Sequence, residues 1–254
     1  MESGESARPL NAEITLEGVI SIQAALESGS RPIDEIIVRR DRRERDLDRL
    51  IRHARAQQIP TREADAADLD ALASGRSHGG IIARVGGRRY ADLPDLIAGL
   101  DTPFIAMLDG VEDPFNFGQA IRALYAAGAN GLVLRPRSWE NAASVVARAS
   151  AGASERIATA IAETAEEAAV FFRERGFTIA VTDKDRAVSI YDADLSGKLF
   201  LLIGGERRGV TRSFADAADV RLKIPYGRGF PMSLGTTSAA AVLAFEVFRQ
   251  RQGK

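Results

Sequence analysis

Short apolar runs alternate with polar, glycine-rich turns along the whole chain. Runs of four to eight residues rich in branched side chains predict buried strands, and longer stretches with apolar positions every three or four residues predict helices. The expected strands are 33–38, 81–85, 104–108, 131–134, 178–181, 199–203 and 220–224. The expected helices are 16–27, one ending near residue 58, 65–74, 118–127, 142–149, 163–175 and 236–248. This alternation predicts an α/β fold with a mostly parallel sheet and helices on both faces.

The same pattern predicts two domains. Residues 1–87 form a small α/β module that is large enough to fold alone, after about eleven polar residues that we expect to fray. Residues 88–101 are the expected linker with a short helix, and residues 102–254 are the larger domain.

The amino-acid composition excludes several classes of protein and of active site. The chain has 254 residues, of which 45% are hydrophobic and 27% charged, as in ordinary globular proteins. No apolar run approaches the ~18 residues of a membrane helix and no signal segment opens the chain, so we expect a cytoplasmic protein without a membrane partner. The absence of cysteine excludes disulfides and zinc–thiolate sites, and His53 and His78 are too few for a metal cluster or an easy Ser-His-Asp triad.

Charge leaves two interpretations open. The net charge of −1 argues against nonspecific coating of nucleic acid, yet residues 204–254 hold nine basic and four acidic residues. Arginine, of which there are 30 against 4 lysines, binds phosphate well, but a codon bias explains the excess equally. The run 39–45 is either a phosphate-binding patch or, as we favour, a solvated helix entry with internal arginine–aspartate pairs. We expect His78, beside two glycines, to be a turn residue.

Two predicted strands end where a ligand can bind main-chain groups. The run 199–203 breaks at Gly204 and Gly205, and the run 220–224 stops at Pro225. A loop containing glycines follows Pro225, and the last predicted helix comes after it. Turns with bare backbone after buried strands suit a flat ligand that lies against backbone donors and acceptors.

Three segments together resemble a known family. They are LDGVEDPFNFGQAIRALYAAGANGLVL at 108–134, LLIGGERRGV at 201–210 and IPYGRGFPMSLGTTSAAAVLAFE at 224–246. In this order they resemble the three motifs of the SpoU/TrmH family of the SPOUT superfamily, over about half of the chain. That family transfers methyl from S-adenosylmethionine to a ribose 2′-hydroxyl in RNA.

The resemblance implies further properties. It implies a C-terminal trefoil knot and a homodimer that pairs through helices near the knot, with residues 239–248 as a suitable apolar face. It also makes the first module a small RNA-binding domain, which is matched weakly at GVISIQAALE and SHGGIIARV. A module of this kind resembles those of ribosomal RNA modifiers, so we expect ribosomal RNA as the target.

The resemblance also assigns site residues and no metal. The catalytic candidates are Asn116, Arg122, Glu206 and Ser233. The cofactor-binding candidates are Ile203, Gly204, Gly205, Ile224, Pro225, Ser233 and Leu234. Without the resemblance, Asn116 reads as a helix N-cap, Arg122 as a surface arginine and Glu206 as a loop carboxylate. Arg122 acts either as a base, which a guanidinium does poorly, or by holding a phosphate and orienting the hydroxyl.

One departure from the family pattern is Gly235, where the family usually has asparagine; Thr236, Thr237 or Ser238 are the candidate substitutes. Three alternatives therefore stay open: a catalytically silent RNA-binding or ribosome-assembly protein, a transfer RNA ribose methyltransferase, and a dinucleotide-binding enzyme. The last is disfavoured because DGVEDP, not Gly-x-Gly-x-x-Gly, follows the first strand of the larger domain. Tyr226 and Arg228 lie on the loop before Gly235, where they are positioned to contact RNA.

Overall fold

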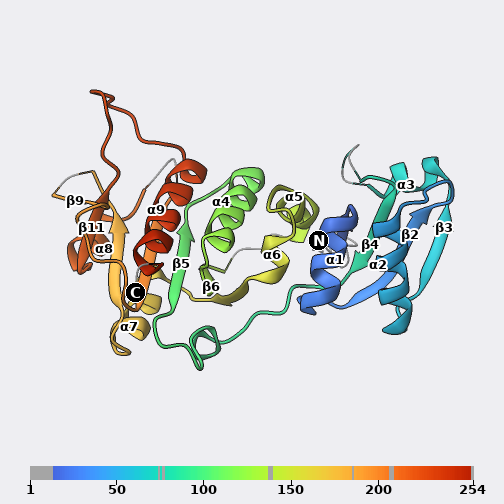
Figure 1. Cartoon of the computed structure of the whole chain (residues 1–254), viewed down its shortest axis with the longest axis horizontal. Helices are drawn as coiled ribbons and strands as arrows, with labels where there is room; N and C mark the ends of the chain where they lie inside the picture. Colours follow the sequence, from blue (N-terminus) through green and yellow to red (C-terminus); the bar gives the residue numbers. More distant parts are fainter. Residues whose placement is uncertain are drawn as a thin grey trace, which may run out of the picture.

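The computed structural model describes residues 14–73, 75, 78–136, 140–184, 186–205 and 209–252. Figure 1 shows two sheets at opposite ends of the long axis, joined by an extended segment. The predicted α/β class is confirmed, with a small mixed sheet first and a larger parallel sheet second.

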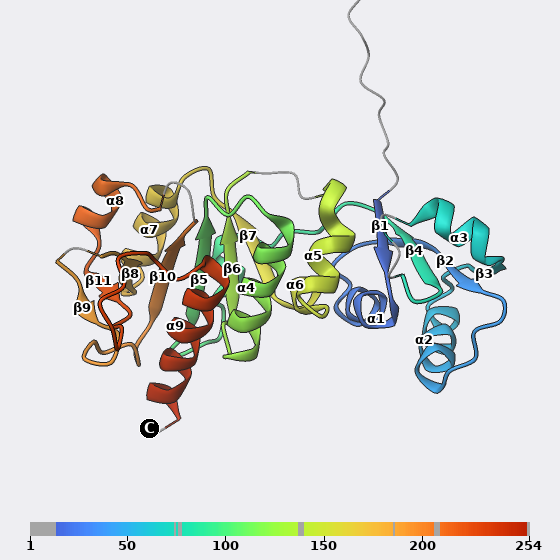
Figure 2. The ribbon, with the colours of Figure 1, turned by 90° about the horizontal axis from the view of Figure 1, so that it is seen from above.

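The first module is a four-stranded sheet in the order β1-β4-β2-β3. Its strands are β1 (Ile14–Glu17), β2 (Ile33–Arg39), β3 (Thr61–Ala64) and β4 (Ile81–Val85). Its helices are α1 (Val19–Ser28), α2 (Arg45–Ala56) and α3 (Ala66–Leu72). β4 runs antiparallel to β1 and β2, whereas β2 and β3 are parallel. In Figure 2, α1 and α2 cover one face of this sheet and α3 lies on the other.

The predicted helix 16–27 is wrong at its start. Residues 14–17 form strand β1, which pairs with β4, and the chain turns at Gly18, whose φ is 83°, before α1 begins. Pairing with a distant strand outweighs the local helical pattern there. The sequence pattern also failed to predict β3, because its four residues TREA bury only Ala64.

The second module is a seven-stranded sheet in the order β7-β6-β5-β10-β8-β11-β9, and every neighbouring pair is parallel. Its strands are β5 (Phe104–Asp109), β6 (Gly131–Leu134), β7 (Ala158–Ile161), β8 (Thr178–Thr182), β9 (Val188–Ser189), β10 (Leu199–Gly204) and β11 (Val220–Lys223). Its α-helices are α4 (Pro114–Ala126), α5 (Ala143–Ala149), α6 (Ala153–Arg156), α7 (Ala165–Arg173), α8 (Arg212–Ala217) and α9 (Thr236–Arg251). The short 3₁₀ helices are η1 (Leu93–Leu96) and η2 (Glu140–Ala142). Figure 2 shows α4 and α9 on one face and α7 and α8 on the other, as predicted.

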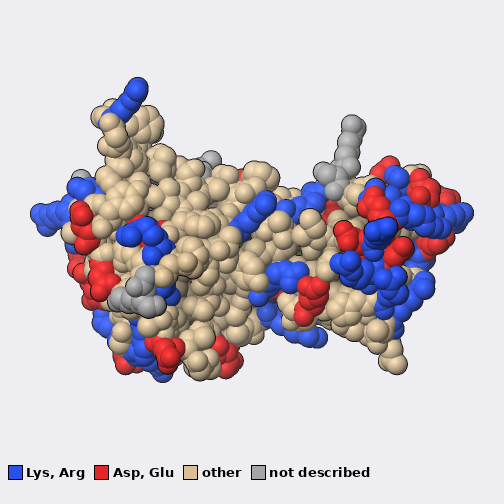
Figure 3. Space-filling view, viewed as in Figure 1, with Lys and Arg blue, Asp and Glu red and all other residues tan. Residues whose placement is uncertain are grey.

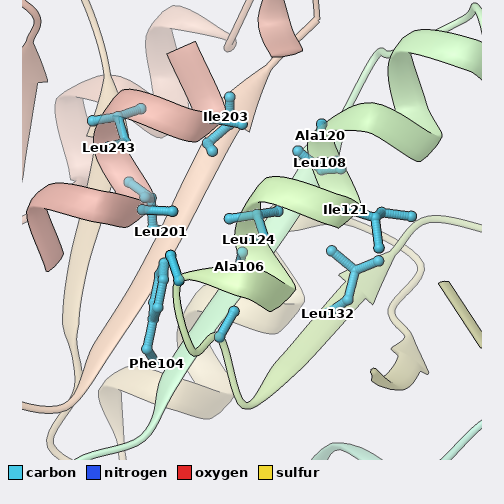
Figure 4. Close-up of a cluster of buried hydrophobic side chains, with 14 of the residues drawn as sticks. Phe104, Ala106, Leu108, Ala120, Ile121, Leu124, Leu132, Leu201, Ile203 and Leu243 are labelled. Atoms are coloured by element: carbon cyan, nitrogen blue, oxygen red, sulfur yellow. The ribbon is translucent and has the colours of Figure 1, made fainter. Parts of the chain in front are cut away.

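Helices α4 and α9 lie side by side on the sheet and share one core. Figure 4 shows Leu124 of α4 and Leu243 of α9 beside Leu201 and Ile203 of β10, and all four are buried. Burying one such side chain contributes about 1.5–3 kcal/mol. The core therefore fixes the starts of both helices relative to the ends of the central strands.

Helix α4 begins four residues before the predicted start at residue 118. Asp113 is its N-cap: one carboxylate oxygen accepts a hydrogen bond from the backbone N–H of Asn116 at 2.7 Å. Pro114 follows at the first helical position, where its missing N–H costs nothing. Asn116 thus lies in the first turn of α4, and the alternative interpretation of it as the N-cap is wrong.

The predicted linker is attached to both modules by backbone hydrogen bonds. Arg89 donates its backbone N–H to Ser30 of the first module at 2.8 Å, and Ala91 donates to Thr159 of the second at 2.9 Å. Ala91 also forms a parallel bridge with Ala160 of β7. These contacts make the connection part of the packed structure.

Buried ion pairs join the modules at a surface that we call the interdomain seam: Glu17, Arg31, Arg88, Arg148 and Glu155. Arg31 lies 3.0 Å and Arg88 3.4 Å from one carboxylate oxygen of Glu155, whose side chain is only 2% exposed. Arg148 on α5 reaches the fully buried Glu17 of β1 at 2.7 Å. Burial lowers the pKa of the Arg88 guanidinium, and the charge of Glu155 opposes that shift. Each buried charge at the seam has an opposite charge beside it.

Candidate active site at the carboxyl edge

The central strands β5 and β10 end at the same level, because they are parallel and Gly204 pairs with Asp109. The next residue, Gly205, donates its backbone N–H to the carbonyl oxygen of Asp109 at 2.6 Å. A Cβ atom at Gly205 would lie 1.9 Å from the carbonyl oxygen of Gly110, so no larger residue fits there. The turns after the two strands are therefore in direct backbone contact.

The start of α9 joins this contact through two hydroxyls. Thr236 donates its hydroxyl to the carbonyl oxygen of Gly204 at 3.5 Å, a long hydrogen bond, and Thr237 donates to that of Asn116 at 3.2 Å. Thr236 is buried. The three sequence motifs thus meet at one edge of the sheet. Thr236 and Thr237, two of the three candidate substitutes for the family asparagine, make the connections.

The loop between β11 and α9 extends beyond the carboxyl edge, as Figure 1 shows. Ile224 is half-buried against the core at its base. Pro225, Ser233 and Leu234 are exposed on its two limbs. The hydroxyl oxygen of Tyr226 accepts a hydrogen bond from the backbone N–H of Leu234 at 3.0 Å and holds the limbs together.

The cofactor candidates therefore occupy two environments. Ile203 is buried in β10, Gly204 is half-buried at its end, and Gly205 is buried in the turn. Ile224, at the base of the loop, completes the part of the set that is packed into the protein. The other three candidates, Pro225, Ser233 and Leu234, face solvent on the loop. All three precede Thr236, which bonds to Gly204, by at least two residues.

Asn116 and Arg122 point in different directions. Six residues along an α-helix correspond to a rotation that leaves two side chains about 120° apart. Asn116 is half-buried on the side of α4 that meets α9, whereas Arg122 is exposed. Within the described residues, Arg122 has no hydrogen bond or ion pair. Glu206 lies outside the described residues.

Sequence reasoning missed three contributors to this edge. Asp109 supplies the carbonyl oxygen for Gly205, and its carboxylate lies 3.6 Å from Arg135, a half-exposed cation after β6. Asp113 caps the helix that carries Asn116. The Asp113–Pro114 pair is a readable start signal, but the strand register that pairs Asp109 with Gly204 requires the structure.

The arginine run 39–45 is largely neutralised by nearby acids. Its ion pairs are Arg39–Asp41 at 2.5 Å, Arg42–Glu44 at 2.9 Å, Arg40–Asp65 at 3.5 Å and Arg43–Glu63 at 3.8 Å. This favours the solvated interpretation of the run. By contrast, Arg45, Arg49 and Arg52 recur along one exposed face of α2. Among the described residues, the ion pair of Arg49 is a solvent-exposed one with Asp46 at 3.6 Å. Figure 3 shows mixed basic and acidic side chains over this module.

His78 is a turn residue, as predicted. One ring nitrogen lies 2.9 Å from Asp70, and the other accepts the backbone N–H of Gly80 at 3.2 Å. In the described part of the chain, no three His, Asp or Glu side chains are grouped to hold a metal ion. Among the helices described, none combines the length and apolarity needed to span a bilayer.

Comparison with known families matches both modules. Residues 103–245 match the SpoU rRNA methylase family, and residues 15–91 match the RNA 2′-O ribose methyltransferase substrate-binding family. The 23S rRNA (guanosine-2′-O-)-methyltransferase RlmB of Escherichia coli K12 is 31% identical over 237 residues, which cover 92% of this chain and 97% of that protein. A putative TrmH family tRNA/rRNA methyltransferase of Staphylococcus aureus is 29% identical over 249 residues, which cover 94% of this chain and 97% of that protein.

Solved structures share the fold over both modules. The SpoU methyltransferase AviRb from Streptomyces viridochromogenes superposes with a TM-score of 0.78 at 23% identity, over 95% of this chain and 90% of that one. An AdoMet-bound rRNA methyltransferase from Sinorhizobium meliloti has a TM-score of 0.78 at 24% identity, over 93% and 87%. The arrangement of the two sheets therefore recurs in these proteins.

Proposed function

Since the chain belongs to the SpoU family and is an RNA 2′-O-ribose methyltransferase, we propose that it methylates ribosomal RNA with S-adenosylmethionine as the methyl donor. The observation that carries the proposal is the meeting of the three motifs. Three hydrogen bonds join the motifs at one edge of the sheet: Asp109 to Gly205, Gly204 to Thr236, and Asn116 to Thr237. The choice of ribosomal RNA rests on the 23S rRNA enzymes among the relatives.

The packed part of the candidate site suits a nucleoside cofactor. Gly204 and Gly205 present backbone groups without side chains, and Ile203 and Ile224 supply apolar surface beside them. We propose that these residues hold S-adenosylmethionine together with Pro225, Ser233 and Leu234 of the loop. When bound, the cofactor supplies a methyl group on a positively charged sulfur. Methyl transfer forms an O–C bond, breaks the C–S bond and releases the hydroxyl proton, so alignment of the ribose oxygen is the main task of the protein.

We assign the alignment of RNA to Arg122 and the support of the site to Asn116. The exposed guanidinium of Arg122 is suited to bind a phosphate next to the target ribose by charge-assisted hydrogen bonds. The backbone of Asn116 is fixed by Asp113 and Thr237, which makes its side chain a stable member of the site. Ser233 supplies a hydroxyl on the loop, and we retain Glu206 as a candidate for positioning these groups.

We propose a homodimer that forms through α4 and α9. Four large side chains on these adjacent helices are exposed by 39–54%: Phe115, Tyr125, Phe245 and Phe248. Figure 3 shows that the face over α4 and α9 is largely uncharged. An apolar patch of this kind is typical of an interface, and a twofold axis would pair it with itself. Arg122 lies on the same face of α4 as Phe115, so in this dimer it is directed at the partner protomer.

A mixing experiment tests whether the active site is shared between protomers. At a cofactor concentration well below Kd, Arg122→Ala and Gly205→Ala proteins are each expected to retain at most about a tenth of wild-type activity. The first loses the phosphate ligand, and the second has a displaced turn at the cofactor site. In a random mixture, half of the dimers contain one protomer of each variant. Each of these mixed dimers carries one intact shared site out of two, which restores about a quarter of wild-type activity. Activity that stays at the level of the separate variants would contradict a shared site, with exchange of protomers verified by two affinity tags.

The first module is proposed to bind the RNA on either side of the target. We place this substrate-binding domain at residues 1–87, the linker at 88–101 and the catalytic domain, with a C-terminal trefoil knot, at 102–254. Support comes from the family match of residues 15–91 and from the arginine face of α2. A cytoplasmic location follows from a ribosomal RNA substrate.

The proposed function is tested by methyl transfer from labelled S-adenosylmethionine. Ribosomal RNA and transfer RNA isolated from cells that lack the gene are offered separately to the purified protein. Label in ribosomal RNA supports the proposal, and label in transfer RNA alone would change the substrate class. Cofactor binding without transfer to either RNA would favour the catalytically silent RNA-binding protein.

A further inference from the structure

The loop of residues 225–235, which we call the projecting loop, leaves large apolar side chains in solvent. All eleven residues are exposed. The four large apolar side chains are exposed by 37–63%: Tyr226, Phe230, Met232 and Leu234. Because burying such a side chain contributes about 1.5–3 kcal/mol, their common exposure indicates a surface that is covered by a partner.

The projecting loop has internal order. The Tyr226 hydroxyl closes it by accepting the backbone N–H of Leu234, eight residues away. The rings of Tyr226 and Phe230 lie next to each other, with centroids 6.1 Å apart and planes inclined by 53°. Two aromatic faces are therefore presented together near the edge where Gly204 and Thr236 meet.

The charge around the rings identifies the partner. Arg228 is exposed between Tyr226 and Phe230 in the sequence, and no acidic residue occurs from 220 to 245. Aromatic rings interleaved with an unopposed arginine are typical of surfaces that bind unpaired nucleotides, where rings stack on bases and arginine binds phosphate.

We propose that the projecting loop is a stacking platform for unpaired nucleotides that flank the target ribose. Tyr226 and Phe230 stack on bases and Arg228 binds the phosphate between them, while the limbs of the loop remain part of the cofactor site. The inference deepens the proposed function and rests on it. It adds a requirement on the substrate: the target ribose lies in a single-stranded segment or loop, because paired bases are not free to stack on protein rings.

The test is the RNA affinity of Phe230→Ala and Arg228→Gln, measured by gel shift and as KM in methyl transfer. Loss of one base–ring contact is expected to weaken RNA binding about tenfold, and Phe230→Trp is expected to retain it. The affinity for S-adenosylmethionine stays unchanged. The matched control is Tyr90→Ala, which removes an aromatic side chain that is 44% exposed. Tyr90 precedes Ala91, which bridges β7 at the edge of the sheet farthest from β11 and the projecting loop.

Three outcomes would overturn the inference: RNA affinity equal to wild type in Phe230→Ala, a loss of cofactor affinity as large as the loss of RNA affinity, or dissociation of the dimer. The last two would assign the rings to the cofactor or to a second copy of the chain. A wild-type protein that binds RNA without methylating it would refute the proposed function alone, because the gel shift still tests the loop. A wild-type protein that does neither would refute both.

Discussion

The interdomain seam and the carboxyl edge both depend on arginines, but they hold them in opposite environments. At the seam, Arg31 and Arg88 are buried against Glu155. At the edge, Arg122 and Arg228 are exposed, and no acidic residue neighbours Arg228 in the sequence. A buried pair stabilises the structure only while both members are present, whereas an exposed cation contributes little to stability and remains available to a ligand. The difference separates residues that hold the two modules together from residues that bind RNA.

The largest expected effect is at the seam. Glu155→Gln leaves Arg31 and Arg88 buried beside a neutral amide, which should lower the free energy of unfolding by about 3–5 kcal/mol. Urea denaturation measures the change. In the control, Glu27→Gln, the lost pair with Arg156 is one-third exposed, so we expect a loss of at most about 1 kcal/mol. Equal stability of the two variants would show that the seam is not held by its charges.

An intermediate effect, on cofactor affinity, is expected at the carboxyl edge. Gly205→Ala places a methyl group against the Gly110 carbonyl and should displace the turn, which weakens cofactor binding at least about tenfold, or 1.4 kcal/mol. Titration calorimetry with S-adenosylmethionine measures this. Gly197→Ala is the matched control, because its Cβ would meet no atom within 4 Å and it lies just before β10, at the opposite end of that strand from Gly205. Similar cofactor affinity in both variants would place the cofactor elsewhere.

These two regions also differ in how far the sequence predicts them. The three motifs and the strands that carry them were readable, because buried runs end in glycine turns. The seam was not, because Arg31 and Glu155 are 124 residues apart and nothing local marks them as partners. Strands β7 and β9 were also missed: they have only four and two residues, and their pairing with β6 and β11 defines them. The sequence alone also did not show that Asn116 and Arg122 lie on different sides of α4. That conclusion requires both residues to be in the helix, and therefore the true helix start, which Asp113 and Pro114 set.

The smallest expected effect concerns Gly235, the N-cap of α9, which offers no side-chain hydrogen bond to the helix. Its φ of −59° is accessible to any residue, and asparagine is among the best N-caps. Gly235→Asn should therefore stabilise the protein by a few tenths of a kcal/mol, measured as a small rise in Tm. A marked loss of stability instead would show that the space at this position is already filled.

The most direct test of the account is the chemical identity of the methylated product. Ribosomal RNA treated with the protein and S-adenosylmethionine is digested to nucleosides and analysed by mass spectrometry, for wild type, Arg122→Ala and the exposed control Arg212→Ala. The account predicts one 2′-O-methylnucleoside with wild type and Arg212→Ala, and about a hundredfold less with Arg122→Ala, which loses an interaction that positions the reacting oxygen. A methyl group on a base, or equal ribose methylation by Arg122→Ala, would contradict it.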